Sequence, residues 1–251
     1  HRQMFDKRES RRMNRAPFAA SVKRWRNKHL AKRDATHADA TCETSSSGSI
    51  NVFARKRPLF DPEKKRGEFD VVSVADGATA VVHNCQMHAD LKRMFVKHCA
   101  YTLSGGVFDE TAQEHDVFAR SAAPLVKRTL DGGVGALFMY GQTGSGKTHT
   151  MENIEKHAFE ALFIGEGGRG AASIKVSYFE IAGKTCVDLL QPGRVEIRLK
   201  ELFEEQGDAL TGQMEVELMG AKEPSVENAV DLKKVIDEGK SRRQTSATQC
   251  N

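Results

Sequence analysis

The chain has 251 residues, of which 39% are hydrophobic and 29% are charged, and this composition is typical of globular protein. No apolar stretch approaches the roughly 20 residues that span a bilayer, and the first ten residues lack the apolar core of a secretory signal. Five cysteines without a Cys-x-x-Cys pair argue against a disulfide framework and a metal site, and they favour a reducing compartment inside the cell.

Positive charge is concentrated at the amino-terminal end. Residues 1–34 hold twelve Lys or Arg and three Asp or Glu, a net of +9, so the totals of 38 and 34 leave −5 for the rest. The spacing of Val22, Trp25, His29 and Lys32 predicts one basic helix in this arm. Such an arm could meet nucleic acid, a lipid surface or an acidic protein, or it could be a solvated tail.

A polar, Ser-rich stretch over residues 35–48 predicts a linker, and we expect a domain boundary near Gly48. Residues 50–58 then predict a strand that Pro58 ends. Two more short strands, 69–74 and 79–84, are predicted around a turn at Asp76-Gly77.

The middle of the chain predicts a helix and a buried strand. Thr111 and Glu114 have the spacing of a capping box, Pro124 should kink or divide the helix that follows, and Gly132-Gly133 should end it. The run GALFMY, residues 135–140, predicts a buried strand that leads directly into a glycine-rich loop.

The carboxyl-terminal part predicts a strand at residues 173–181 and a last helix. Ser225 is its expected cap, Leu232 and Ile236 lie on its apolar face, and Gly239 follows its end. Because strands alternate with helices, the sequence predicts the α/β class, with a sheet covered by helices on its faces.

The glycine-rich loop has the spacing Gly-x-x-x-x-Gly-Lys-Thr, which predicts a phosphate-binding loop. Backbone N–H groups in such a loop surround a phosphate at the positive end of the following helix, so glycine is needed where a side chain would obstruct that approach. Lys147 should reach the β- and γ-phosphates, and the Thr148 hydroxyl should bind Mg²⁺. The predicted nucleotide-binding residues are Gly141, Gln142, Thr143, Gly144, Ser145, Gly146, Lys147, Thr148 and His149.

A second Gly-Lys-Thr, at Gly183, has Tyr178 where the first glycine of the motif would be. We therefore interpret it as a surface turn after a strand. The guanine-recognition sequence Asn-Lys-x-Asp is also missing, since the Asn-Lys at Asn27-Lys28 continues as His-Leu. Adenine is the favoured base.

At this point the chain resembles a known family. YGQTGSGKTHTM, from Tyr140, is similar to the phosphate loop of kinesin motor domains, and RKRPL, from Arg55, is similar to their adenine-contacting strand. VFDET, FEIAGKTCVDLL and RRQTSATQCN follow in family order, so the resemblance covers about residues 50–251. It implies the kinesin motor fold, a P-loop NTPase-type central mixed sheet with helices on both faces. It also implies that Arg55, Arg57 and Pro58 contact the nucleotide, with Arg55 and Pro58 on adenine and His149 on its other side.

Within the kinesins the motifs look most like kinesin-13, the internal motors that depolymerise microtubules and carry a basic neck before the motor. Residues 1–34 resemble that neck. The subfamily's Lys-Val-Asp loop tip corresponds here to His88, Ala89 and Asp90, and a histidine carries less positive charge than a lysine near neutral pH. The predicted tubulin-contacting residues are His88, Ala89, Asp90, Lys92 and Arg93.

The resemblance implies an ATP-dependent microtubule motor, an ATP hydrolase of depolymerase type, that uses ATP/ADP and Mg²⁺. Tubulin or microtubules are the expected partners, without nucleic acid or membrane, and the expected location is the cytoplasmic cytoskeleton, with the spindle left open. Two alternatives remain: a non-hydrolysing or translocating kinesin that binds microtubules without depolymerising them, and an unrelated phosphate-loop enzyme. Asn251 aligns with the start of the first switch, so we expect the catalytic residues to follow it and the protein to continue.

Overall fold

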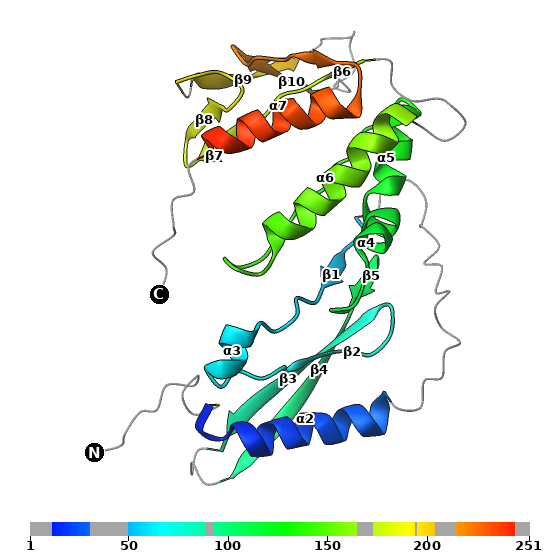
Figure 1. Ribbon diagram of the computed structural model, residues 1–251, viewed down its shortest axis with the longest axis vertical. Coiled ribbons are helices and arrows are strands. Elements are labelled where there is room, and N and C mark those ends of the chain that lie inside the picture. The colour runs from blue at the N-terminus through cyan, green and yellow to red at the C-terminus, as the bar shows by residue number, and fades with distance from the viewer. Residues whose placement is uncertain are drawn as a thin grey trace. The chain divides into compact units, whose positions relative to one another are not determined.

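The computed structural model describes residues 12–30, 50–88, 93–164, 173–193, 195–203 and 214–243 (Figure 1). The chain forms two compact units, His1–Ser121 and Ala122–Asn251, and each is described by itself. The predicted linker at 35–48, the boundary near Gly48 and Lys32 all lie outside the described residues.

The first unit is built on a three-stranded antiparallel sheet in the order β2-β3-β4. These strands are β2 (Val72–Val74), β3 (Thr79–Met87) and β4 (Met94–Thr102). The predicted turn between β2 and β3 is confirmed, because Asp76 Oδ1 accepts a hydrogen bond from the Ala78 amide at 2.9 Å. Strand β4 was not predicted from the sequence. It is stabilised by antiparallel pairing with β3 over nine residue pairs.

A second, parallel pair joins β1 (Phe53–Arg55) to β5 (Gly106–Phe108). The strand predicted over 50–58 is therefore shorter than expected. Ile50 is 86% exposed and Val52 48% exposed, so these two side chains add little to the core. The short helix α3 (Asp61–Lys65) follows Pro58, and α4 (Glu114–Ser121) closes the unit.

The predicted basic helix is confirmed as α2 (Arg15–His29), and it packs against the sheet instead of standing in solvent (Figure 1). Phe18 and Val22, four residues apart and hence on one face, are only 2% and 1% exposed. The Trp25 ring lies 5.4 Å from the His98 ring of β4, centroid to centroid. Over these residues the solvated-tail alternative is wrong.

The second unit contains α5 (Ala123–Leu130), α6 (Lys147–Ile164) and a four-stranded antiparallel sheet in the order β10-β9-β8-β7. The strands are β7 (Phe179–Ala182), β8 (Thr185–Asp188), β9 (Glu196–Phe203) and β10 (Met214–Met219). A small antiparallel pair, β6 (Ile174–Lys175) with β11 (Ser225–Val226), lies beside α7 (Ala229–Arg242). The core of this unit gathers Val176, Val226, Leu232 and Ile236, against which Phe159 and Leu162 of α6 pack.

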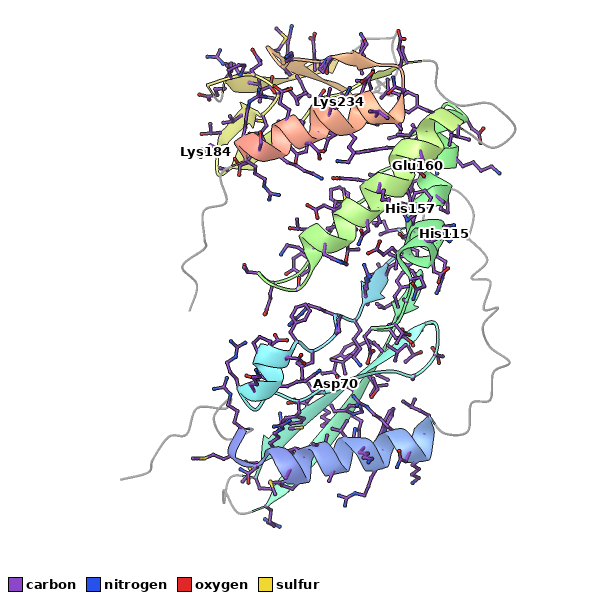
Figure 2. The ribbon with its side chains drawn as sticks, viewed as in Figure 1. Asp70, His115, His157, Glu160, Lys184 and Lys234 are labelled. Atoms are coloured by element: carbon purple, nitrogen blue, oxygen red, sulfur yellow. The ribbon has the colours of Figure 1, made fainter. Side chains whose placement is uncertain are left out.

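Several predictions of elements in this region are confirmed. Pro124 lies in the first turn of α5, so one predicted helix is divided into α4 and α5, and Gly132 with a φ of 88° follows its end. The second Gly-Lys-Thr is a surface turn, because β7 and β8 form a hairpin around Gly183, whose φ is 63°. Figure 2 labels Lys184 at this turn.

Two predicted helix starts are wrong. The Thr111 hydroxyl donates to Asp109 Oδ1 at 2.7 Å, and α4 begins only at Glu114, so Thr111 and Glu114 form no capping box. Ser225 belongs to β11, and the cap of α7 is Asn228, whose side chain accepts from the Asp231 amide at 2.9 Å.

The predicted apolar face of α7 is confirmed, but its end is not. Gly239 lies inside the helix, which continues to Arg242, and the ring of Tyr178 occupies the space where a Cβ of residue 239 would stand. The predicted strand at 173–181 is likewise broken, into β6 and β7.

The predicted buried strand at 135–140 is also wrong. Phe138 is 89% exposed, Tyr140 is fully exposed, and no described strand pairs with this segment. A buried central strand needs neighbours for its N–H and C=O groups on both sides. Across the described ranges the strands form four separate sheets of two, four, two and three strands, in place of the single central mixed sheet that was expected.

None of the helices described here is long and apolar enough to cross a membrane.

Candidate nucleotide-binding site

The glycine-rich loop has a backbone that only glycine adopts readily. Gly141, Gly144 and Gly146 have φ values of 155°, 78° and 97°, which are disfavoured for residues with a side chain. A Cβ on Gly141 would also lie 2.5 Å from Ser145 Oγ. The loop therefore needs glycine both for its conformation and for the space inside it.

Helix α6 begins at Lys147, the residue directly after the last of these glycines. The loop thus ends at the positive end of an 18-residue helix, where backbone N–H groups and the helix dipole favour an anion. Lys147 Nζ donates to the carbonyls of Gly141 and Gln142 at 2.7 and 3.0 Å, so the ammonium group curls back over the loop. This arrangement fits a bound phosphate, whose oxygens would replace the two carbonyls as acceptors for the Lys147 ammonium.

The remaining predicted residues of the loop lie at its surface. Gln142, Thr143, Thr148 and His149 are all exposed. Thr148 is the second residue of α6, so its hydroxyl accompanies Lys147 at the helix start. A threonine hydroxyl is an oxygen ligand of the kind that Mg²⁺ accepts, and the rest of the coordination would come from phosphate and water.

Helix α6 is tied to α7 within the second unit. Lys240 of α7 forms an ion pair with Glu155, eight residues into the phosphate-loop helix. Burial acts to lower the pKa of Lys240, but the hydrogen bond and charge of Glu155 outweigh it and raise that pKa above its usual value. Figure 2 shows the charged side chains of both helices, with His157 and Glu160 labelled on α6 and Lys234 on α7.

The residues expected to contact adenine lie in the first unit, at the end of β1. Arg57 donates to Glu63 Oε1 at 2.6 Å, and its guanidinium lies 4.6 Å from the centre of the Phe60 ring. The hydrogen bond from Arg57 and that from the Phe60 amide lower the pKa of Glu63. Arg57 therefore stabilises the turn into α3. In the sequence, Arg55 precedes Lys56-Arg57 and Pro58 follows it.

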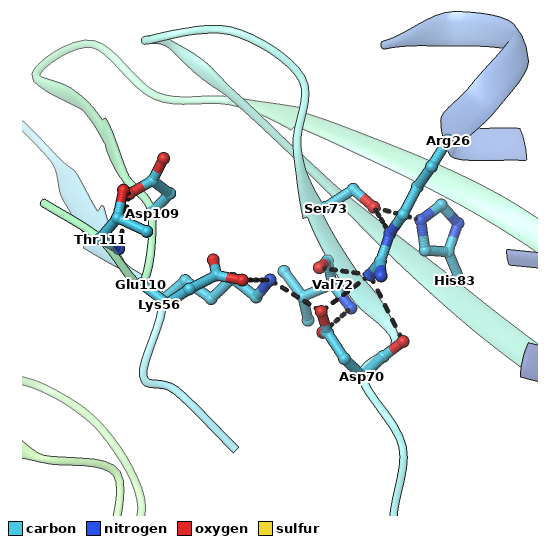
Figure 3. Close-up of polar contacts among 9 residues, drawn as sticks. All are labelled: Arg26, Lys56, Asp70, Val72, Ser73, His83, Asp109, Glu110 and Thr111. Carbon is cyan, nitrogen blue, oxygen red and sulfur yellow. Dashed lines mark hydrogen bonds and ion pairs between the residues drawn. The ribbon is translucent and has the colours of Figure 1, made fainter. Parts of the chain in front are cut away.

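Between Arg55 and Arg57, Lys56 joins a polar network (Figure 3). Lys56 Nζ donates to Asp70 Oδ2 at 2.8 Å and to Glu110 Oε1 at 2.9 Å, and its backbone N–H donates to the Phe108 carbonyl at 2.9 Å. Next to Glu110, Asp109 accepts from Thr111, which lowers the pKa of the Asp109 carboxyl. The RKRPL and VFDET segments are thus held together side chain to side chain.

Sequence reasoning missed a histidine cluster beneath α2. His83 is 1% exposed, its Nε2 lies 2.8 Å from Ser73 Oγ, and its Nδ1 lies 2.7 Å from Nδ1 of His98. Trp25 completes the cluster, with its ring 4.8 Å from that of His83. Only the alternation of β3, which turns His83 inward between Val81 and Cys85, could have indicated this burial.

The predicted tubulin-contacting tip is only partly within the described residues. His88 and Arg93 flank it, and the His88 amide donates to the Arg93 carbonyl at 2.8 Å. The His88 ring lies 4.7 Å from that of Phe95. Ala89, Asp90 and Lys92 lie outside the described residues.

A glycine-rich loop that leads into a helix, with a lysine at the helix start folded back over the loop, has the form of the phosphate-loop nucleotide-binding proteins. A family model described as "Kinesin motor domain" matches residues 55–251. The chain therefore belongs to the kinesin motor-domain family.

Relatives with curated descriptions agree with this assignment. The chain is 32% identical over 212 residues to "Kinesin-like protein KIF24" of Mus musculus, a match that covers 80% of this chain and 15% of the relative. The Homo sapiens protein of that description is also 32% identical over 212 residues, covering 80% and 14%. "Kinesin-like protein KIN-13A" of Oryza sativa subsp. japonica is 28% identical over 221 residues, covering 86% and 26%. The chain spans about a quarter or less of the length of these relatives.

Proposed function

We propose that this chain is the nucleotide-binding part of an ATP-driven microtubule motor of the type that depolymerises microtubules. The observation that carries the proposal is the phosphate loop at the start of α6, in a chain of the kinesin motor-domain family. The match to a relative described as KIN-13A supports the kinesin-13 type.

In this proposal the loop residues Gly141 to Thr148 hold the phosphates of ATP or ADP. The Lys147 ammonium would move from the loop carbonyls to the β- and γ-phosphates, and the Thr148 hydroxyl would be one of the ligands that hold Mg²⁺, an ion that neutralises phosphate charge when bound. Arg55 and Pro58 pack on adenine in this proposal, since a guanidinium group stacks on aromatic rings.

The same proposal assigns the microtubule contact to the tip of the β3–β4 hairpin and to the arm. Residues 88–93 meet tubulin, and the exposed lysines of α2, Lys23 and Lys28, attract the acidic surface of the polymer. ATP binding would order the switch segments of the motor, which would stabilise curved tubulin at a polymer end, and hydrolysis would release it. Salt should weaken the encounter, because exposed charges are screened within about 10 Å at 0.1 M.

The test uses the full-length protein with stabilised microtubules. After incubation with MgATP and sedimentation, tubulin in the supernatant measures depolymerisation, and Lys147→Ala is the matched variant without the phosphate contact. ATP-dependent release that Lys147→Ala abolishes is the expected result. Protein that pellets on intact polymer with no tubulin released would favour the translocating or non-hydrolysing alternative, and the His88-Ala89 replacement at the tip would be the first suspect.

A further inference from the structure

One carboxylate oxygen in the first unit is shared between the arm helix and the segment expected to hold adenine. Asp70 Oδ2 accepts from Arg26 Nη2 of α2 at 2.9 Å and from Lys56 Nζ at 2.8 Å (Figure 3). Arg26 also joins α2 to β2, because it donates to Ser73 Oγ at 2.7 Å and to the Val72 carbonyl at 2.9 Å. Asp70 is therefore the junction between α2 and residues 55–58.

The contacts around this junction are partly sheltered from water. The side chain of Lys56 is 12% exposed, and those of Arg26 and Asp70 are 30% and 31% exposed. Burial acts to raise the pKa of the Asp70 carboxyl, but hydrogen bonds from Lys56 and the Val72 amide, with the charge of Arg26, outweigh it and leave the pKa below its usual value. Asp70 thus carries its charge at neutral pH and attracts both cations.

Lys56 connects Asp70 to residues 55–58, because it contacts Asp70 and belongs to that segment. Its backbone is held to β5 by the hydrogen bond to Phe108, and its side chain is held by Asp70 and Glu110, so the main chain at 56 is restrained from two directions. Arg55 precedes it directly, and Pro58 follows two residues later. A rotation of the Asp70 carboxylate on loss of Arg26 would therefore act on Lys56, the residue next to Arg55.

We propose that Asp70 is a positioning residue that couples the docking of α2 to the conformation of residues 55–58, so that the docked arm helix raises the affinity for ADP and ATP. The inference rests on the proposed function of that segment. Coupling between two sites is reciprocal, so bound nucleotide must in turn hold α2 more firmly on the sheet. The arm is then a part of the nucleotide site's support as well as a carrier of positive charge.

The first experiment measures the affinity of the full-length protein for a fluorescent ADP analogue in the presence of Mg²⁺. Asp70→Asn and Arg26→Gln should each weaken binding about fivefold, the lower end of typical coupling between sites. The double variant should be no weaker than either single variant, because both remove the same link. Arg24→Gln is the matched control, since it removes the same charge from an exposed position of the same helix and should leave affinity unchanged.

The second experiment measures hydrogen exchange of the α2 amides, residues 15–29, with and without MgADP. In the wild type and in Arg24→Gln, MgADP should slow exchange about fivefold, and in Asp70→Asn it should have no effect on this helix. A variant that merely unfolds would exchange rapidly in all segments, whereas loss of coupling leaves exchange in β3 and β4 unchanged.

Several distinct outcomes would count against these ideas. Unchanged affinity in both Asp70→Asn and Arg26→Gln, or an additive loss in the double variant, would overturn the coupling. Normal ADP binding without any slowing of exchange in α2 would also overturn it. No binding by the wild type, or equal binding by Lys147→Ala, would overturn the nucleotide site itself and the coupling with it.

Discussion

Acidification should destabilise the first unit through the buried ring of His83. Burial lowers the pKa of His83 from 6.5 to about 4, and the nearby charges of His98 and Arg26 act in the same direction. The unfolded chain takes up this proton near pH 6.5, whereas the folded chain resists it until about pH 4. The stability that His83 contributes as a neutral ring is therefore complete above pH 6.5 and is lost as the pH falls toward 4.

The size of the loss follows from the two pKa values. The difference between 6.5 and about 4, at about 1.4 kcal/mol for each pH unit, amounts to about 3 kcal/mol, of which about 2 kcal/mol is lost by pH 5. The contact between His83 and His98 is one reason why protonation of His83 is unfavourable in the folded state. The Nδ1 atoms of His83 and His98 lie 2.7 Å apart, so one ring must accept the hydrogen bond that the other donates, and protonating both rings would leave two donors facing each other.

The assay is urea denaturation at about pH 7.5 and at about pH 5, with unfolding monitored by the fluorescence of Trp25. This is the only tryptophan among the 251 residues, and its ring lies 4.8 Å from that of His83. The wild type should lose about 2 kcal/mol of unfolding free energy between the two pH values, and His83→Gln should lose much less. His115→Gln, at an exposed position on α4 (Figure 2), is the control and should behave as the wild type. Equal losses in the wild type and His83→Gln would refute the reasoning.

Four further changes have expected outcomes. Lys147→Ala should abolish binding of a fluorescent ADP analogue while leaving the thermal melting temperature unchanged, because it removes the ammonium group that curls over the loop. Phe18→Ala should cost about 3 kcal/mol and speed hydrogen exchange in α2, since this side chain is 2% exposed. Asn228→Ala should cost about 1 kcal/mol in urea denaturation, because α7 loses its cap. Gly239→Ala should also destabilise, by about 1 kcal/mol, because the new methyl group meets the Tyr178 ring and this outweighs the gain in helix propensity.

Local signals in the sequence were sufficient where a residue's own chemistry decides the structure. The glycines of the phosphate loop, Pro124 at the start of α5 and the Asp76-Gly77 turn each set the backbone by steric limits or by a neighbouring hydrogen bond. The lysine of the loop was identified in the same way, because the motif places it at the first residue of α6.

Features that depend on distant partners could not be read from local sequence. Strand β4 is stabilised by its nine residue pairs with β3. The segment 135–140 is apolar but pairs with no described strand. The burial of His83 requires the indole of Trp25, more than fifty residues away in the chain, to cover it. Asp70 gives no local sign of its role, since both its cationic partners come from other segments.

In the β3–β4 hairpin, the register of the two strands is set by the paired residues below the tip. Nine register pairs, from Thr79 with Thr102 to Met87 with Met94, and the further hydrogen bond from the His88 amide to the Arg93 carbonyl define the stem on both sides of residues 89–92. Those four residues can then be exchanged as a cassette. A graft of another motor's tip onto this stem should keep the fold and transfer only its surface chemistry, which makes the hairpin a natural scaffold for comparing tips on one motor.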